Sequence, residues 1–236
     1  MLVDRLNKII AKWKGHRYTI DKNIPTGYLL LLVWSRAMML VWGKLSMIKN
    51  KGLFFLSPAA TVKCRSRLRV GRSVTIERKS FIDALSVEGI ILGNNVSVGV
   101  GTKIEGTGNL QFLGKGMKVG NNVGLGTDSF YGCAGGIEIG DHTIIGNFVS
   151  FHSENHVYDD LDTPIRLQGV KHDGITVGSN CWIGAKCTIL DGAEIGNGCI
   201  IAAGAVVKKG IYAANGIYGG VPARLIMKRD EYLKYA

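Results

Sequence analysis

The chain is most constrained by branched aliphatic residues that recur at every sixth position toward its C-terminus: Val177, Ile183, Ile189, Ile195, Ile201 and Val207. Glycines at positions 178, 184, 196 and 204 stand between them. A period of six matches neither the helical period nor the alternation of an ordinary strand. Short strands joined by tight turns produce such a period, and the strands stack into a β-helix. The sequence therefore predicts an all-β solenoid.

The same spacing continues upstream in shorter runs: Val70, Ile76, Ile82; Leu92, Val98, Ile104, Leu110; Val119, Leu125, Tyr131; and Ile139, Ile145, Phe151. Corner phrases such as V-G-N-N-V combine glycine with asparagine, which tolerate the backbone angles of tight turns. Three such hexads would complete one triangular turn. We therefore expect each ladder residue to stack on the residue eighteen positions away, within one solenoid domain.

Five cysteines are present, and no two of them form a C-x-x-C pair. Cys181, Cys187 and Cys199 stand two positions before ladder residues, where small side chains suit the interior. This placement predicts buried thiols rather than zinc ligands or disulfides, and it indicates a reducing compartment. A cleavable signal segment is not evident near the start.

The net charge of +11 is concentrated in one part of the chain. Residues 1–80 hold 17 Lys and Arg against 3 acidic residues, whereas residues 81–236 hold 12 against 15, giving +14 and −3. A basic block of this size suggests nucleic acid at first sight. The apolar residues interleaved with the charges argue against that partner and favour a membrane surface.

Two segments of the N-terminal region, residues 1–55, have membrane-like patterns. Leu2 to Trp13 reads as a basic amphipathic helix, and Gly27 to Gly43 is apolar except for Ser35 and Arg36. A full span needs about 20 apolar residues, and a central Arg costs roughly 2.5–3.5 kcal/mol there. An interfacial or half-inserted helix on an anionic membrane is therefore expected. The alternative is a helix that packs against the solenoid or a neighbouring subunit.

The ladder is interrupted between Phe151 and Val177 by a polar, acidic segment, which we expect to leave the solenoid over residues 152–174. This extension contains His152, His156 and His172, three of the five histidines. Segments that leave a rigid scaffold commonly carry function. We therefore look for the chemistry here.

Three phrases in order, G-S-N-C-W-I-G-A, I-I-A-A-G-A-V-V and G-G-V-P-A-R, make residues 60–227 resemble the hexapeptide-repeat acyltransferases. Within that family, the text is similar to the sugar O-acetyltransferases, which include galactoside and maltose acetyltransferases. The resemblance implies a left-handed parallel β-helix over residues 56–221. The N-terminal region is then a helical appendage, and residues 222–236 are expected to form a C-terminal capping helix.

The resemblance also assigns a catalytic base. A sugar hydroxyl must lose its proton before it can attack a thioester, and a neutral imidazole is suited to accept it near pH 7. His156 aligns with the family's catalytic His, and His152 is the alternative. Glu154, Asp159 or a backbone carbonyl could orient the imidazole. Trp182 is implied to wall the acceptor pocket. The expected sugar contacts are Tyr158, Asp159, Asp160, Asp162 and Arg166.

One family residue is missing from this sequence. Relatives of the galactoside type hold the oxyanion with an Asn, whereas the aligned position here is Gly126. A backbone N–H, Ser129 or Asn147 could replace it, and the sequence leaves these alternatives open.

Acetyl-coenzyme A is the donor that the resemblance implies, bound between adjacent subunits of a homotrimer. Ala185 and Ala203 match positions that line its channel. Lys208, Lys209 and Arg224 are the cations expected near its phosphates. No phosphate-binding loop of the GxGxxG or P-loop type is present, and no metal is expected.

These observations predict an acetyl-coenzyme A-dependent O-acetyltransferase that modifies a sugar hydroxyl. The basic N-terminus suggests a lipid-linked acceptor, such as a precursor of a surface polysaccharide or O-antigen. We expect a peripheral protein on the cytoplasmic face of the inner membrane. Alternatives are N-acylation of an amino sugar, a zinc hydratase of the γ-carbonic anhydrase type, or a non-catalytic membrane solenoid. The hydratase is disfavoured because His152 and His156 are four residues apart rather than five.

Overall fold

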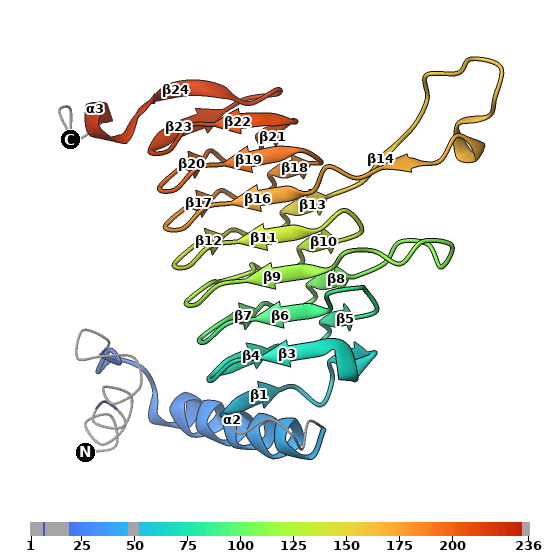
Figure 1. The fold of residues 1–236 in the computed structure, drawn as a ribbon. Helices are drawn as coiled ribbons and strands as arrows, with labels where there is room; N and C mark the ends of the chain where they lie inside the picture. Colours follow the sequence, from blue (N-terminus) through green and yellow to red (C-terminus); the bar gives the residue numbers. More distant parts are fainter. Residues whose placement is uncertain (1–6, 8–18, 47–51, 233–236) are drawn as a thin grey trace.

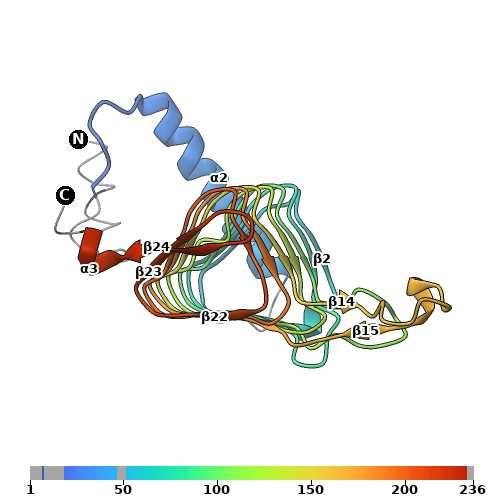
Figure 2. The ribbon, with the colours of Figure 1, turned by 90° about the horizontal axis from the view of Figure 1, so that it is seen from above.

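The structure is a computed structural model that describes residues 7, 19–46 and 52–232. Short parallel strands wind into a left-handed β-helix with three flat faces, and helix α2 (Thr26–Ser46) lies across its N-terminal end (Figure 1). Seen along its axis, the solenoid is a triangular prism (Figure 2). The predicted fold class is confirmed. The basic helix predicted over Leu2 to Trp13 lies outside the described residues.

Each turn of the prism crosses the three faces. One turn has no strand on face A, where Gly124 forms only isolated bridges to Ser97 and Ile144. Face A holds β1 (Phe54–Leu56), β4 (Val74–Ile76), β7 (Ser97–Val98), β12 (Ile144–Ile145), β17 (Trp182–Ile183), β20 (Ile200–Ile201) and β23 (Gly216–Gly219). Face B holds β2 (Thr61–Lys63), β5 (Phe81–Asp83), β8 (Lys103–Glu105), β10 (Phe130–Gly132), β13 (Ser150–His152), β18 (Thr188–Leu190) and β21 (Val206–Val207). Face C holds β3 (Leu68–Val70), β6 (Ile90–Leu92), β9 (Met117–Val119), β11 (Ile137–Ile139), β16 (Ile175–Val177), β19 (Ala193–Ile195) and β22 (Gly210–Tyr212). The turns from A to B form the AB edge, and the turns from B to C form the BC edge.

The ladder residues fill the interior of the prism. Ile76, Ile82, Ile183 and Ile189 are fully buried, and the ring of Tyr131 stacks on that of Phe151 with centroids 5.0 Å apart. Hydrophobic burial along this column is the main stabilising contribution to such a fold. The three cysteines predicted to lie inside are buried free thiols, which confirms that expectation.

The eighteen-residue spacing holds only near the C-terminus, where Val177 pairs with Ile195 and Ile183 with Ile201. Elsewhere the turns are longer. Ile82 pairs with Ile104 across 22 residues, and Ile104 pairs with Tyr131 across 27. The 27-residue turn contains an outward segment between β8 and β9, and the longest turn, 38 residues from Phe151 to Ile189, contains the large extension.

The prediction that Leu110 belongs to the buried ladder is wrong, because its side chain is 85% exposed. It lies on the segment between β8 and β9, which we call the small insertion (residues 106–116). This segment leaves the prism after Glu105 and returns at Met117. The six-residue spacing from Ile104 to Leu110 therefore carries no structural meaning, because the coil leaves the prism between them.

The larger extension leaves face B after β13 and returns to face C at β16. It contains β14 (Asn155–His156), the short helix η2 (Ile165–Leu167) and β15 (Val170–Lys171). The strands β14 and β15 pair antiparallel and project from the BC edge (Figures 1 and 2).

The C-terminal segment differs from the predicted helix over residues 222–236. Residues Arg224–Lys228 form strand β24, which pairs antiparallel with β23, and within the described residues, which end at 232, only Arg229–Tyr232 form a one-turn helix, α3. A strand is favoured here because the last strand of face A would otherwise leave unpaired backbone groups at the end of the solenoid. The end is therefore covered by a hairpin.

Candidate active site

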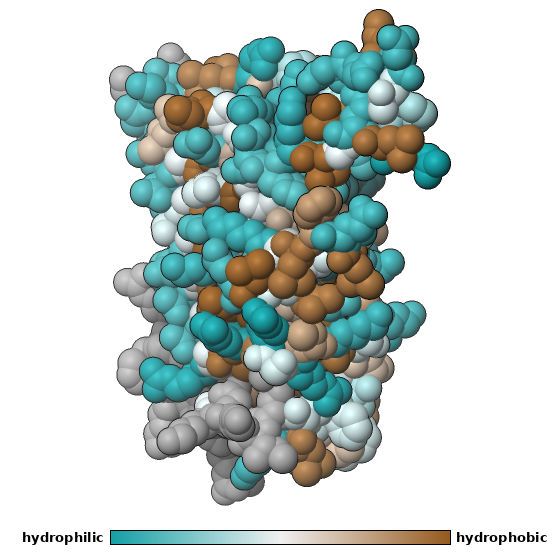
Figure 3. Space-filling view, turned by 45° about the vertical axis from the view of Figure 1, so that its right-hand side comes forward, coloured by the Kyte–Doolittle hydropathy of each residue, from teal (hydrophilic) through white to brown (hydrophobic). Residues whose placement is uncertain are grey.

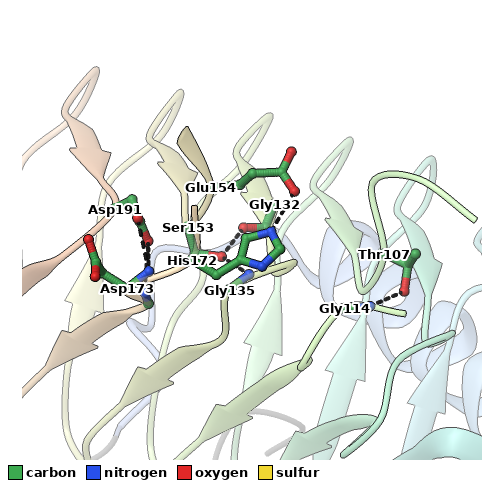
Figure 4. Close-up of polar contacts among 10 residues, drawn as sticks. Thr107, Gly114, Gly132, Gly135, Ser153, Glu154, His172, Asp173 and Asp191 are labelled. Atoms are coloured by element: carbon green, nitrogen blue, oxygen red, sulfur yellow. Dashed lines mark hydrogen bonds and ion pairs between the residues drawn. The ribbon is translucent and has the colours of Figure 1, made fainter. Parts of the chain in front are cut away.

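The extension is tied to the prism by buried polar groups at its neck (Figure 4). The Ser153 hydroxyl is fully buried, donates to the Gly132 carbonyl at 2.7 Å and accepts from the Gly135 N–H at 3.0 Å. Asp191 is 1% exposed, and its carboxylate accepts the N–H groups of Asp173 and Gly174, the latter at 2.7 Å. Both strands of the neck are thus fixed to the scaffold.

Two ion pairs join the neck from outside. Glu154 lies 2.9 Å from Nε2 of His172, so the outgoing and returning segments are linked across the neck (Figure 4). Lys209 lies 2.8 Å from Asp173, and this hydrogen bond raises the pKa of the Lys209 amine. These contacts fix the place on the prism from which the β14–β15 hairpin projects.

The far part of the extension is organised by its own polar side chains. Gln168 donates to the carbonyls of Asp160 and Thr163, both at 2.7 Å. The Asp160 carboxylate accepts from the Thr163 hydroxyl and the Asp162 N–H, and these bonds lower the pKa of Asp160. Asp160 therefore stabilises the conformation of the extension. It also lies on the surface where a sugar contact is expected.

The two candidate bases occupy different surroundings. His156 is exposed on β14, opposite Val170, and its side chain forms no hydrogen bond with any residue of the described chain. His152 lies on face B with its ring 5.5 Å from that of Phe130. Partial burial there lowers the pKa of His152. His152 is also exposed, and its side chain forms no hydrogen bond within the described residues, so both imidazoles are accessible. Of the two, only His156 lies on the hairpin that projects from the prism.

Neither predicted carboxylate partner engages His156. Glu154 pairs with His172, and Asp159 lies 3.2 Å from the Lys171 ammonium. Tyr158 and Arg166, the other expected sugar contacts, are exposed on the same extension. The sequence pattern did not reveal the contacts of His172 with Glu154 or of Asp191 with the Asp173 and Gly174 N–H groups, because they depend on how the two ends of the extension meet at the neck.

The expected donor-site residues lie on two edges of the prism. Trp182 is 55% exposed on β17, and Ala185 follows it in the turn of the AB edge. Ala203 stands one coil further on at the same edge, and Arg224 begins β24 beside it. Lys208 and Lys209 instead stand at the BC edge, between β21 and β22.

The structure separates the three oxyanion candidates. Gly126 lies at the AB edge with φ +67°, and a Cβ there would collide with the carbonyl oxygen of Gly146. Ser129 is 2% exposed and its hydroxyl is bonded within the coil. Asn147 is exposed at the AB edge, and its carbonyl oxygen accepts from the Thr127 N–H at 3.1 Å. Its side-chain NH2 group forms no hydrogen bond within the described residues.

Within one subunit, these residues form two separate groups. The extension group includes His156, Tyr158 and Arg166 at the BC edge, whereas the AB-edge group includes Asn147 and Trp182. Figure 3 shows the side that carries the extension and the small insertion, with apolar side chains gathered in its middle. Exposed apolar residues on these two segments include Leu110, Phe112, Leu161, Ile165 and Leu167.

The repeats match known transferase sequences. Residues 174–209 match the bacterial transferase hexapeptide (six repeats), and residues 73–104 match the hexapeptide repeat of succinyl-transferase. This chain carries the hexapeptide repeats of bacterial transferases. It is also 31% identical over 74 residues to a protein of Mycobacterium tuberculosis named "Probable acetyltransferase". That match covers 31% of this chain and 25% of the relative, so the chain spans about a quarter of the relative's length.

Two solved structures share the fold. Both are of AntD, an N-acyltransferase from Bacillus cereus. A mutant in complex with dTDP and coenzyme A has a TM-score of 0.57 and 24% identity, covering 71% of this chain and 92% of AntD. A mutant with dTDP-4-amino-4,6-dideoxyglucose and coenzyme A has a TM-score of 0.50 and 19% identity, covering 76% and 87%. In the described part of the present chain, no three His, Cys, Asp or Glu residues are grouped as a metal site.

Proposed function

We propose that this protein is an O-acetyltransferase that moves the acetyl group of acetyl-coenzyme A to a sugar hydroxyl. The observation that carries the proposal is the exposed, unpartnered imidazole of His156 on an extension that the prism holds rigidly. Hexapeptide repeats of transferases and the acetyltransferase relative support the reaction class. The coenzyme A in the AntD complexes supports the donor.

The chemistry assigns one role to each group. The His156 imidazole accepts the proton of the sugar hydroxyl, whose oxygen then attacks the thioester carbonyl. The side-chain amide of Asn147 is the donor that faces the resulting oxyanion. The carbon–sulfur bond breaks, and the proton held by His156 passes to the coenzyme A thiolate. The atoms and charges of this transfer balance without an external oxidant or a metal.

The separation of the two groups supports a homotrimer. An extension at the BC edge of one subunit would meet the AB edge of the next, so that each site combines His156 with Asn147 and Trp182 of a neighbour. The exposed apolar residues of the extension and the small insertion would then be covered. In this arrangement Ala185, Ala203 and Arg224 of one edge receive the donor, while Lys208 and Lys209 approach from the other subunit.

A second candidate is N-acylation of an amino sugar, which is favoured by the AntD likeness, since AntD is an N-acyltransferase solved with an amino sugar nucleotide. One experiment separates the two. The protein is incubated with labelled acetyl-coenzyme A and sets of neutral sugars, amino sugars and lipid-linked glycans. Label on the acceptor that alkaline hydroxylamine releases is an oxygen ester and supports O-acetylation, whereas label that resists it is an amide on an amine. Absence of transfer to every acceptor would reject both.

A further inference from the structure

Helix α2 has one side that packs against the solenoid. Leu29 and Met39 are only 2% and 3% exposed, and a Cβ added at Gly43 would collide with the carbonyl oxygen of Phe54 in β1. At about 100° per residue, positions 29, 36, 39 and 43 fall on the same side of a helix. This inner side covers the N-terminal end of the prism.

Arg36, the charge at the middle of this apolar helix, belongs to the inner side. Its guanidinium lies 2.8 Å from the carboxylate of Glu77, which follows β4 in the solenoid. The other charged residue of α2 is Lys44, about 80° around the helix from Arg36. The side opposite Arg36 therefore carries no charge.

That opposite side is apolar and open. We call it the outer face of α2, and its large side chains are 41–68% exposed: Leu30, Leu31, Trp34, Met38, Val41, Trp42 and Leu45. The helix has 21 residues, and an 18-residue stretch of it has a mean hydropathy of 1.4, which is long and apolar enough by length and composition to cross a membrane. Soluble monomers rarely expose an apolar surface of this extent, so it requires a partner.

The surroundings of the outer face are basic. Seven cations are exposed on the first two coils of the prism, at the end where α2 lies: Lys63, Arg65, Arg67, Arg69, Arg72, Arg78 and Lys79. Within the described residues, none of these cations forms an ion pair with a carboxylate. Clustered cations beside an apolar helix face complement anionic lipid headgroups.

We propose that the outer face of α2 docks onto an anionic lipid bilayer with the helix lying in the plane of the interface, so that the prism stands upright on the membrane. Trp34 and Trp42 are the amphipathic rings suited to that depth. A spanning helix is disfavoured because α2 lies across the end of the solenoid (Figure 1), and insertion would draw the basic first coil into hydrocarbon.

Vesicle flotation tests the surface. The full-length protein should float with vesicles of phosphatidylcholine and phosphatidylglycerol, and less with phosphatidylcholine alone or at high salt. Trp34→Glu should weaken binding roughly tenfold or more, because it places a charge on the buried face. The matched control is Ile211→Glu, an exposed apolar residue (82%) on β22 at the other end of the prism, which should bind normally. Equal binding of the two variants would overturn the proposal.

Two further measurements complete the test: the depth of α2 in the bilayer and the self-association of the protein. Two single-tryptophan chains are prepared, one retaining Trp34 and the other Trp42, with the remaining tryptophans replaced by Phe. These positions are eight residues apart, or about 12 Å along the helix. Equal, shallow quenching by brominated lipids supports docking in the plane, whereas depths that differ by that distance show a spanning helix and refute it. A smaller assembly of Trp34→Glu without vesicles, relative to Ile211→Glu, would instead identify the outer face as a subunit contact.

Discussion

At the residue scale, the three histidines of the predicted extension differ in their side-chain contacts, and His156 has none within the described residues. His172 is held by Glu154, and His152 lies against the Phe130 ring. The polar gap in the ladder predicted an extension that begins at residue 152, but His152 is the last residue of β13, so only His156 and His172 lie on the extension. The gap could not show which imidazole stays free, because that depends on contacts between the two strands of the neck.

His156→Ala should lower kcat by roughly 10²–10⁴-fold, the usual contribution of a positioned general base. The dissociation constant of coenzyme A should change little, because the imidazole is not expected to hold the donor. Steady-state acetyl transfer and calorimetric coenzyme A binding measure the two effects. Near-normal turnover in this variant, together with an inactive His152→Ala, would move the base to His152.

The stability of the protein should depend on pH through His152. Its pKa is lowered in the folded state from the value of about 6.5 that an unfolded chain gives. The unfolded chain therefore binds more protons than the folded chain, and the unfolding free energy rises with pH up to about 6.5. The stabilisation that His152 contributes is lost as the pH falls below that value. Compared with the wild type, His152→Gln should lose less stability between pH 7.5 and pH 5.5 in urea unfolding. An equal loss in both proteins would contradict this.

At the scale of elements, the repeat predicted the prism well where its period is regular and poorly where coils are longer. Val177 to Val207 are inward as expected, because every coil there has the same length. Leu110 had the right spacing but stands outside, since spacing alone does not reveal a segment that leaves the scaffold. Arg224 to Lys228 form a strand rather than a helix because an open sheet edge lies beside them.

Asp191 is the residue on which the neck of the extension most depends. Asp191→Ala leaves the N–H groups of Asp173 and Gly174 without their acceptor and should cost about 1–3 kcal/mol of unfolding free energy. Hydrogen exchange at these two amides should accelerate, and kcat should fall as the extension loosens. Asp191→Asn keeps one acceptor oxygen and should show smaller effects. Unchanged exchange in Asp191→Ala would show that other contacts hold the neck.

At the scale of the whole molecule, membrane docking would set the height of the active site. In face B, β13 lies four strands above β2. At ~4.8 Å between neighbouring strands, the extension begins roughly 19 Å above the first coil. A lipid-linked acceptor in the same bilayer would have to reach that far.

We therefore predict that membrane-bound enzyme acetylates lipid-linked glycans of several sugars in preference to a lipid carrying one sugar. The measurement compares both acceptors in the same vesicles, by mass spectrometry. Detergent micelles serve as the control, because they remove the fixed height and should reduce the preference. Equal rates on both acceptors in vesicles would contradict the upright orientation.

The central claim is that each active site joins the extension of one subunit to the AB edge of another, and mixing two inactive chains tests it most directly. His156→Ala removes the base from the extension, and Ala203→Trp fills the donor edge. Each variant alone should be inactive. Co-expressed trimers should regain about a quarter of the sites, because that fraction of random interfaces pairs an intact extension with an intact edge. Recovery of acetyl transfer near that level is the predicted result. Mixed trimers that form and stay inactive would contradict the account, because they would show that each site is built from a single chain.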